Sequence, residues 1–172
     1  APSGWQNAAV TVTLTATDPT PSSGIAKTCY SVNQGTWTIS TTVVISAEGT
    51  NTLTYYSVDN AGNTETTQTK VVLIDRISPI TTDNASSGWQ NAVVIVTLMP
   101  ADNLSGIAET CYSVNQGTWT MGTTVVISTK GTNTLTYYSV DNAGNTETTQ
   151  TKVVLIDKIA PITTDNAPSG WQ

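Results

Sequence analysis

The chain has 172 residues, of which only 10% are charged, and its formal net charge is −6. It contains no histidine, which excludes Ser-His-Asp triads, Cys-His dyads and every histidine-ligated metal site. The acidic balance argues against a nucleic-acid partner, because phosphate binding needs clustered Lys and Arg. No apolar run approaches the roughly 18 residues of a membrane helix, so membrane insertion is not expected either.

The first predicted strand covers residues 10–16, where Val10, Val12 and Leu14 alternate with threonine. An alternation of period two is typical of a half-buried antiparallel strand. Glycine and asparagine separate the segments and supply the conformations that hairpin turns need. Five more strands are predicted in the first half of the chain, over residues 25–32, 36–39, 42–46, 51–58 and 66–74. No segment has helical periodicity, so the predicted fold is an all-β, Ig-like antiparallel sandwich.

The second half of the chain repeats the first. Residues 85–166 align with residues 1–84 once Thr20 and Pro21 are omitted, and 67 of the 82 aligned pairs are identical. Exposed positions match as well as core positions, which indicates a recent duplication or selection for interchangeable units. A repeat of about 80 residues can bury a core of its own. We therefore predict two tandem Ig-like sandwiches, each folding separately.

Several strings in each copy resemble a known group of repeats. The strings are Cys-Tyr-Ser-Val at 29–32, Gly-Thr-Trp-Thr at 35–38, and Leu-Thr-Tyr-Tyr-Ser-Val-Asp-Asn-Ala-Gly-Asn at 53–63. They resemble the tandem Ig-like, fibronectin-III-like repeats of bacterial and archaeal surface proteins. The resemblance implies the sandwich fold and an extracellular or cell-surface setting. It fixes no function, because such modules serve mostly as spacers and stalks.

The family pattern also predicts the domain boundaries: a first repeat over residues 1–78, a second over 79–160, and a linker with a further strand over 161–172. In that pattern the segment after the linker proline is the first strand of the next domain. The second repeat then owns such a strand at residues 80–84, and the first repeat lacks one. The same sequence returns near the end of the chain as Ile162, Thr163, Thr164, Asp165 and Asn166. This segment either continues a covalent array or acts as a donor strand for another chain.

Apolar residues on outward strand positions predict a lateral contact surface. If the alternate residues of each strand face the core, six apolar side chains face outward. A contiguous stripe of such side chains would mark an interaction surface. They are Tyr56, Val58, Val71, Leu73, Val93 and Ile95. The alternative is that neighbouring loops of the same domain cover these six side chains.

Each repeat has one cysteine, so neither Cys29 nor Cys111 can pair within its own repeat. If Tyr30 and Val32 face the core, Cys29 faces outward, which would suit disulfide crosslinks between domains or chains. The alternative is a small buried hydrophobic residue with a packing role only.

Two ligand hypotheses remain. Asp102 and Asp141 are expected in loops at one pole of the second sandwich, close to the linker residue Asp75, and three carboxylates there could hold Ca²⁺. Asp59 and its neighbours are equally explained as turn residues. Aromatic side chains could stack on sugars or could plug the cores and domain junctions. The tryptophans concerned are Trp5, Trp37, Trp89, Trp119 and Trp171.

The sequence taken as a whole indicates a protein that is not an enzyme and needs no cofactor beyond this calcium. We expect a segment of an extracellular filament or cell-surface stalk that associates with itself head to tail and laterally. An adhesin, or a carbohydrate-binding or spacer module of a secreted protein, is the alternative.

Overall fold

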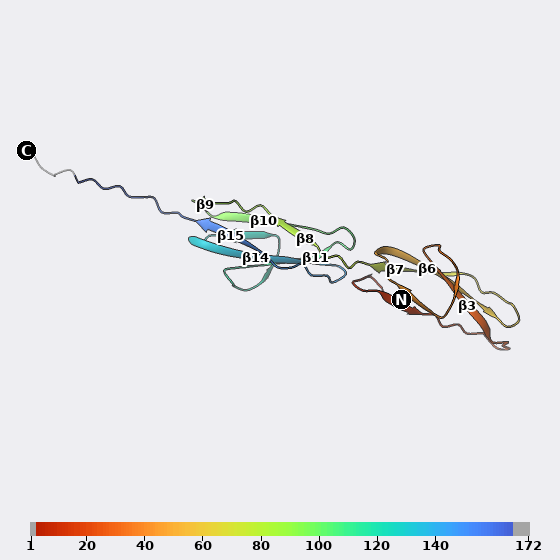
Figure 1. The fold of residues 1–172 in the computed structure, drawn as a ribbon. Coiled ribbons are helices and arrows are strands. Elements are labelled where there is room, and N and C mark those ends of the chain that lie inside the picture. Colours follow the sequence, from red (N-terminus) through yellow and green to blue (C-terminus); the bar gives the residue numbers. More distant parts are fainter. Residues whose placement is uncertain (1–2, 167–172) are drawn as a thin grey trace, which may run out of the picture. The chain divides into compact units, whose positions relative to one another are not determined.

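The computed structural model describes residues 3–166, and all regular secondary structure within them is β-strand (Figure 1). A search of these residues finds no helix with the length and apolar character required to cross a membrane. Each repeat forms two sheets whose facing sides enclose a core, which confirms the prediction of all-β, Ig-like sandwiches.

The first repeat contributes seven strands. They are β1 (Trp5–Gln6), β2 (Val10–Thr13), β3 (Ile25–Val32), β4 (Thr38–Ile39), β5 (Thr42–Ile45), β6 (Gly49–Asp59) and β7 (Gln68–Ile74). One sheet has the order β1-β7-β6-β3-β4, and the other contains only β2 and β5. The core forms where alternate residues of both sheets meet: Val12 and Ile45 from the small sheet pack with Leu53 from the large one. The threonines between them face outward, as period two requires.

The second repeat has the same arrangement with one strand more. Its strands are β8 (Ile80–Asp83), β9 (Trp89–Gln90), β10 (Val94–Ala101), β11 (Ile107–Val114), β12 (Thr120–Met121), β13 (Thr124–Ile127), β14 (Gly131–Asp141) and β15 (Gln150–Ile156). The large sheet has the order β12-β11-β14-β15-β9, and the small sheet is β13-β10-β8. The additional strand, β8, lies at the edge of the small sheet, a position that no strand of the described chain takes in the first repeat.

Most predicted strands are found, and one of them, over residues 25–32, has the predicted bounds. The strand predicted over 10–16 ends at Thr13. The Ser-Gly-Trp-Gln segments lie outside the predicted strands, yet they form the short strands β1 and β9, which pair in parallel with β7 and β15. Trp5 lies opposite Leu73, so the backbone of this segment satisfies its hydrogen bonds on the edge of the large sheet.

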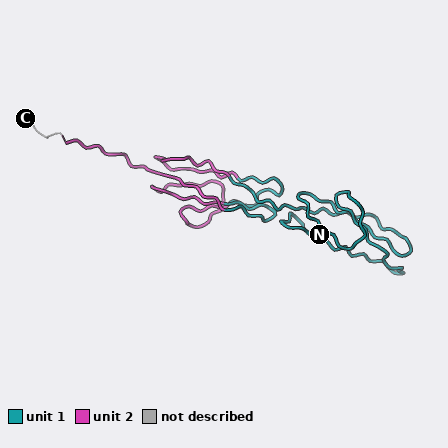
Figure 2. Tube along the Cα trace, viewed as in Figure 1, with its two compact units in different colours: residues 1–81, 100–110, 138–148 teal, residues 82–99, 111–137, 149–172 magenta. Residues whose placement is uncertain are grey.

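The chain divides into two compact units, drawn in different colours in Figure 2. Unit 1 comprises residues 1–81, 100–110 and 138–148, and unit 2 comprises residues 82–99, 111–137 and 149–172. The first unit thus includes the whole first repeat, the start of β8, and two loops of the second repeat with the adjoining ends of β10, β11 and β14. The units are groups of residues in mutual contact, and they do not coincide with the two sequence repeats. The domain boundaries at residues 78 and 160 therefore stay a prediction.

Candidate functional site

The linker that follows β7 begins with a buried aspartate. Asp75 is fully buried, and its backbone N–H donates to the carbonyl of Gln6 at 2.9 Å. Its carboxylate accepts the N–H of Ile77 at 3.0 Å through Oδ1 and the N–H of Ser105 at 2.9 Å through Oδ2. The Asn145 amide donates to the Asp75 carbonyl at 2.8 Å. All these residues belong to unit 1, so the start of the linker is ordered within one compact unit.

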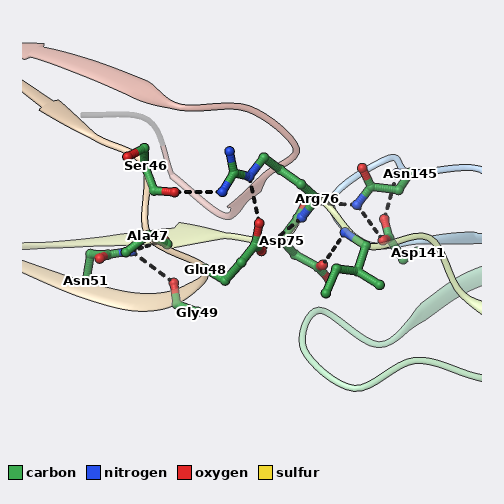
Figure 3. Close-up of polar contacts among 10 residues, drawn as sticks. Ser46, Ala47, Glu48, Gly49, Asn51, Asp75, Arg76, Asp141 and Asn145 are labelled. Atoms are coloured by element: carbon green, nitrogen blue, oxygen red, sulfur yellow. Dashed lines mark hydrogen bonds and ion pairs between the residues drawn. The ribbon is translucent and has the colours of Figure 1, made fainter.

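The next linker residue, Arg76, is anchored on the first repeat (Figure 3). Its Nε lies 2.6 Å from Glu48 Oε1, and its Nη2 donates to the carbonyl of Ser46 at 2.8 Å. The buried Asn51 amide holds this turn by donating to the carbonyl of Ala47 at 2.7 Å. The ion pair is exposed and contributes little stability by itself.

Three carboxylates gather beside the linker. One oxygen each of Asp75, Asp102 and Asp141 lies within 4.8 Å of the others, and all three residues belong to unit 1. Asp102 accepts the N–H of Gly106 at 2.7 Å, while Asp141 accepts the backbone and amide N–H groups of Asn145 at 2.8 Å and 2.7 Å. The structure therefore brings together the three residues predicted to bind Ca²⁺. Metal binding itself stays a prediction.

The environment of Asp75 favours a charged carboxylate. Burial raises its pKa, but the nearby Ser105 hydroxyl and the N–H groups of Ile77 and Ser105 more than offset this and hold the pKa below its ordinary value. The Ser105 hydroxyl lies close enough to influence Asp75, yet it reaches hydrogen-bond geometry with no group in the described part of the chain. Ser105 is only 9% exposed, so a buried oxygen beside the carboxylates has no partner of its own.

The first repeat has counterparts of two of these three carboxylates, Asp18 for Asp102 and Asp59 for Asp141. Asp18 accepts the N–H of Gly24 at 2.9 Å, as Asp102 does with Gly106. Asp59 accepts the Asn63 amide at 2.7 Å, and this hydrogen bond is the main reason that its pKa is lowered. Within residues 3–166 the only cluster of three metal-ligating side chains is the one at Asp75.

A buried polar network holds β8 in the second repeat. The N–H of Thr81 donates to Glu147 Oε1 at 2.8 Å, and the Thr81 hydroxyl lies 2.7 Å from the Ser139 hydroxyl. The other Glu147 oxygen accepts the N–H of Ser139 at 3.1 Å. Glu147 is only 7% exposed and Ser139 is fully buried. Sequence reasoning missed this network, because Glu147 lies in a Thr-rich segment with no strand pattern.

The far end of β8 is held through an aspartate. The Tyr137 hydroxyl donates to Asp83 Oδ2 at 2.8 Å, and Lys152 Nζ lies 3.5 Å from Asp83 Oδ1. The next residue, Asn84, pairs with Thr97 of β10: the N–H of Thr97 donates to the Asn84 side chain at 2.7 Å. The strand is therefore fixed by side chains at both of its ends.

Of the two alternatives for Cys29, the structure contradicts the exposed thiol and supports the small buried residue. Cys29 does point away from the core face that holds Tyr30, but it is only 4% exposed. It lies opposite Tyr56 in register, and the ring of Trp37 packs edge-on against Tyr56 with centroids 4.9 Å apart. Aromatic side chains on the outer face thus shield the thiol, and its hydrogen bond with Tyr56 raises the pKa of that phenol. Cys111 is half-buried, and both thiols are free.

The six residues predicted to form a lateral stripe lie on separate strands. Val71 and Leu73 share the outer face of β7, whereas Tyr56 and Val58 lie near the end of β6. Val71 is paired with Thr52, four residues before Tyr56, so the two pairs form no continuous stripe. Ile95 lies in a different sheet, on β10, and Val93 directly precedes that strand; they are 61% and 46% exposed. A lateral contact through any of them stays a prediction.

Four of the five tryptophans lie within the described residues. Trp89 is 62% exposed, and Trp37 and Trp119 are each 47% exposed, while Trp5 is half-buried. Trp171 lies outside the described residues. A core role is therefore excluded for the three exposed rings, and glycan stacking on them stays a prediction.

The segment predicted as a donor strand is exposed. All five residues from Ile162 to Asn166 are exposed, and none of them is assigned to a strand. Ile162 is 89% exposed, the largest fraction among the exposed large hydrophobic residues of the described chain.

No protein-family model matches this chain, and no curated protein does. Among solved structures, the fibronectin(III)-like modules of Clostridium thermocellum CbhA are similar, with 14% identity and a TM-score of 0.47 over 95% of this chain and 94% of that chain. The FN1–FN3 domains of chicken CNTN1 are similar over 88% of this chain, with 10% identity and a TM-score of 0.35. This chain spans 64% of that fragment, just under two thirds. The assignment of a fibronectin-III-like, Ig-like fold rests on the strand order and register described above.

Proposed function

We propose that this protein is a non-enzymatic structural unit of an extracellular filament or cell-surface stalk, in which Ig-like repeats are joined head to tail. The observation that carries the proposal is that three contacts of the linker recur where the chain leaves each repeat. A linker anchored through the same contacts on every repeat would reproduce one junction geometry along an array.

The anchoring contacts can be compared one by one. Asp157 donates its backbone N–H to the carbonyl of Gln90 at 2.8 Å and accepts the N–H of Ile159 at 2.9 Å, as Asp75 does with its own partners. Lys158 donates to the carbonyl of Ser128 at 3.1 Å, in the place where Arg76 contacts Ser46. The substitution of Arg by Lys thus keeps the contact with the carbonyl. The ion pair of Arg76 with Glu48 does not recur, because the residue equivalent to Glu48 is Lys130. The contacts shared by the two exits are those with the backbone carbonyl groups and with the N–H of the isoleucine.

Negative-stain electron microscopy of the native material tests the proposal. We expect filaments with an axial repeat that matches one or two sandwiches. The filaments should survive reductant, because Cys29 is buried; fraying under reductant would instead assign a crosslink to the half-buried Cys111. Isolated particles in both conditions would contradict the filament and favour the adhesin or glycan-binding alternative, for which the exposed Trp89 is the support.

A calcium ion that stiffens the linker is a second candidate function, and the Ser105 hydroxyl favours it. Three carboxylates and an unpartnered buried hydroxyl offer the oxygen ligands that Ca²⁺ prefers. An ion there would also offset the repulsion between the three negative charges.

Calcium addition to the chelator-treated protein should raise its melting temperature by several degrees, as binding to the folded state alone requires. The variant Asp102→Asn should lose most of this shift. Asp18→Asn is the control, measured at a protein concentration at which the chain is monomeric. Asp18 accepts the N–H of Gly24 as Asp102 accepts that of Gly106, but only two carboxylates meet there in the described first repeat, so this variant should keep the shift. Equal melting temperatures with calcium and with chelator would contradict the metal site. The measurement is differential scanning calorimetry at fixed ionic strength.

A further inference from the structure

We propose that the first repeat binds residues 157–166 of a second copy of this chain as an edge strand, in the position that β8 takes in the second repeat. The inference rests on the proposed head-to-tail assembly and names the surfaces that would carry it. The acceptor is a groove in the first repeat, and the donor is the exposed segment that follows the second repeat.

The acceptor groove retains the groups that hold β8 in the second repeat. A cavity of about 670 Å³ lies in the first repeat, between the edge of the small sheet and the large sheet. Its lining includes Thr13, Tyr55, Ser57, Glu65 and Lys70. These residues correspond in the repeat alignment to Thr97, Tyr137, Ser139, Glu147 and Lys152, which all bind β8 or the residue after it. The groove thus keeps the binding groups of a strand that the described part of the first repeat does not contain.

Burial differs at the same residues in the two repeats. Tyr137 is 5% exposed, whereas Tyr55 is only half-buried. Glu147 is buried, but Glu65 is exposed. The segments that carry these residues, Gly49 to Asp75 and Gly131 to Asp157, are identical in sequence. Their sequence therefore does not account for the difference in exposure, whereas β8 contacts Tyr137 and Glu147 in the second repeat. A strand added to the first repeat would bury these side chains as β8 does in the second.

The donor segment matches the strand that the groove lacks. Residues 162–166 have the same sequence as residues 80–84, Ile-Thr-Thr-Asp-Asn, and they are exposed along their whole length. Asp157 precedes Ile162 by the same five positions that separate Asp75 from Ile80. The donor therefore carries both the strand and the linker aspartate in the spacing found at the first junction.

The second repeat defines the expected contacts. Thr163 would donate its N–H to Glu65 and share a hydrogen bond with Ser57, as Thr81 does with Glu147 and Ser139. Asp157 would join Asp18 and Asp59, completing the three-carboxylate cluster that the first repeat lacks. Because the donor and the acceptor are different surfaces, the contact is heterologous, and each chain can bind one neighbour through its donor and another through its acceptor.

A peptide-binding experiment with the full chain tests the acceptor. The probe is a synthetic peptide with the sequence of residues 157–166, titrated into the chain carrying Thr163→Pro. This substitution removes the N–H of an exposed residue, disables the chain's own donor and leaves both sandwiches untouched. We expect saturable binding of one peptide per chain. A peptide that carries the same proline should bind the chain at least about ten-fold more weakly, since a hydrogen bond to a charged group is lost. The chain with the groove substitution Glu65→Ala should bind the unmodified peptide more weakly by a similar factor, for the same reason. Glu109→Ala is the charge-matched control and should bind like the parent.

Sedimentation velocity tests the donor in the intact chain. The unmodified chain should form concentration-dependent oligomers, and Thr163→Pro should abolish them. Oligomers that persist unchanged in Thr163→Pro would overturn the inference while leaving the filament proposal intact. Absence of peptide binding would overturn it too. The size of the polypeptide in denatured native filaments gives a further test. A single long polypeptide, in which covalently preceding residues supply the edge strand, would also overturn the inference. Separate chains would support it.

Discussion

Replacing Glu147 by alanine is expected to lower the free energy of unfolding of the second repeat by about 2–4 kcal/mol, because two N–H groups lose a charged acceptor inside the protein. The two groups belong to Thr81 and Ser139, which are both buried. The identical residue in the first repeat, Glu65, is exposed, and Glu65→Ala should change the free energy of unfolding by no more than about 0.5 kcal/mol.

Urea unfolding followed by circular dichroism provides this comparison. Both variants are best made in the Thr163→Pro background, so that no second chain can bury Glu65. Equal losses for the two substitutions would contradict the role assigned to β8, because β8 supplies the N–H of Thr81 to Glu147 and has no counterpart in the described first repeat.

Leu135→Ala should destabilise the second repeat by about 2–5 kcal/mol, the range observed when a buried leucine leaves a cavity. Leu135 is fully buried between the two sheets of this repeat, and β-strands on both sides restrict the collapse of the cavity. Thermal unfolding should show one transition moving to lower temperature, while the transition of the other repeat stays in place.

Val153→Thr is the matched control for this substitution. Val153 is 51% exposed on β15, and threonine keeps its β-branched shape, so the expected change is within about 0.5 kcal/mol. If Leu135→Ala shifted both transitions equally, the two sandwiches would unfold as one cooperative unit, and the assumption of separately folding repeats would be wrong.

The comparison of Glu65 with Glu147 bears on the proposed strand exchange. Both repeats contain the groups that hold an edge strand, but only one of them has the strand within the described chain. In the proposed assembly the groove of the first repeat is the binding site, and residues 162–166 of another chain are its ligand. The interface would then reuse contacts that the second repeat already makes with β8.

The calcium hypothesis illustrates a different relation between sequence and structure. The sequence predicted that Asp75, Asp102 and Asp141 would lie near one another, because sandwich loops gather at the poles of the fold, and the structure places them within 4.8 Å. It could not reveal the buried Ser105 hydroxyl beside them, since nothing in a Ser-Gly turn indicates whether its side chain finds a partner.

The amino-acid sequence by itself determined the fold class, the tandem arrangement and most of the strands, because alternation of valine and threonine is a local signal with a fixed physical meaning. It also located the segment that could serve as a donor strand, through simple repetition. The tertiary structure alone decided which side chains are buried. Cys29 faces outward as the alternation requires, yet it lies close to Tyr56, on the face that Trp37 also covers. Glu147 is buried by β8, which lies 66 residues before it in the chain. Burial depends on what packs against a position from elsewhere in the molecule, and no local pattern contains that information.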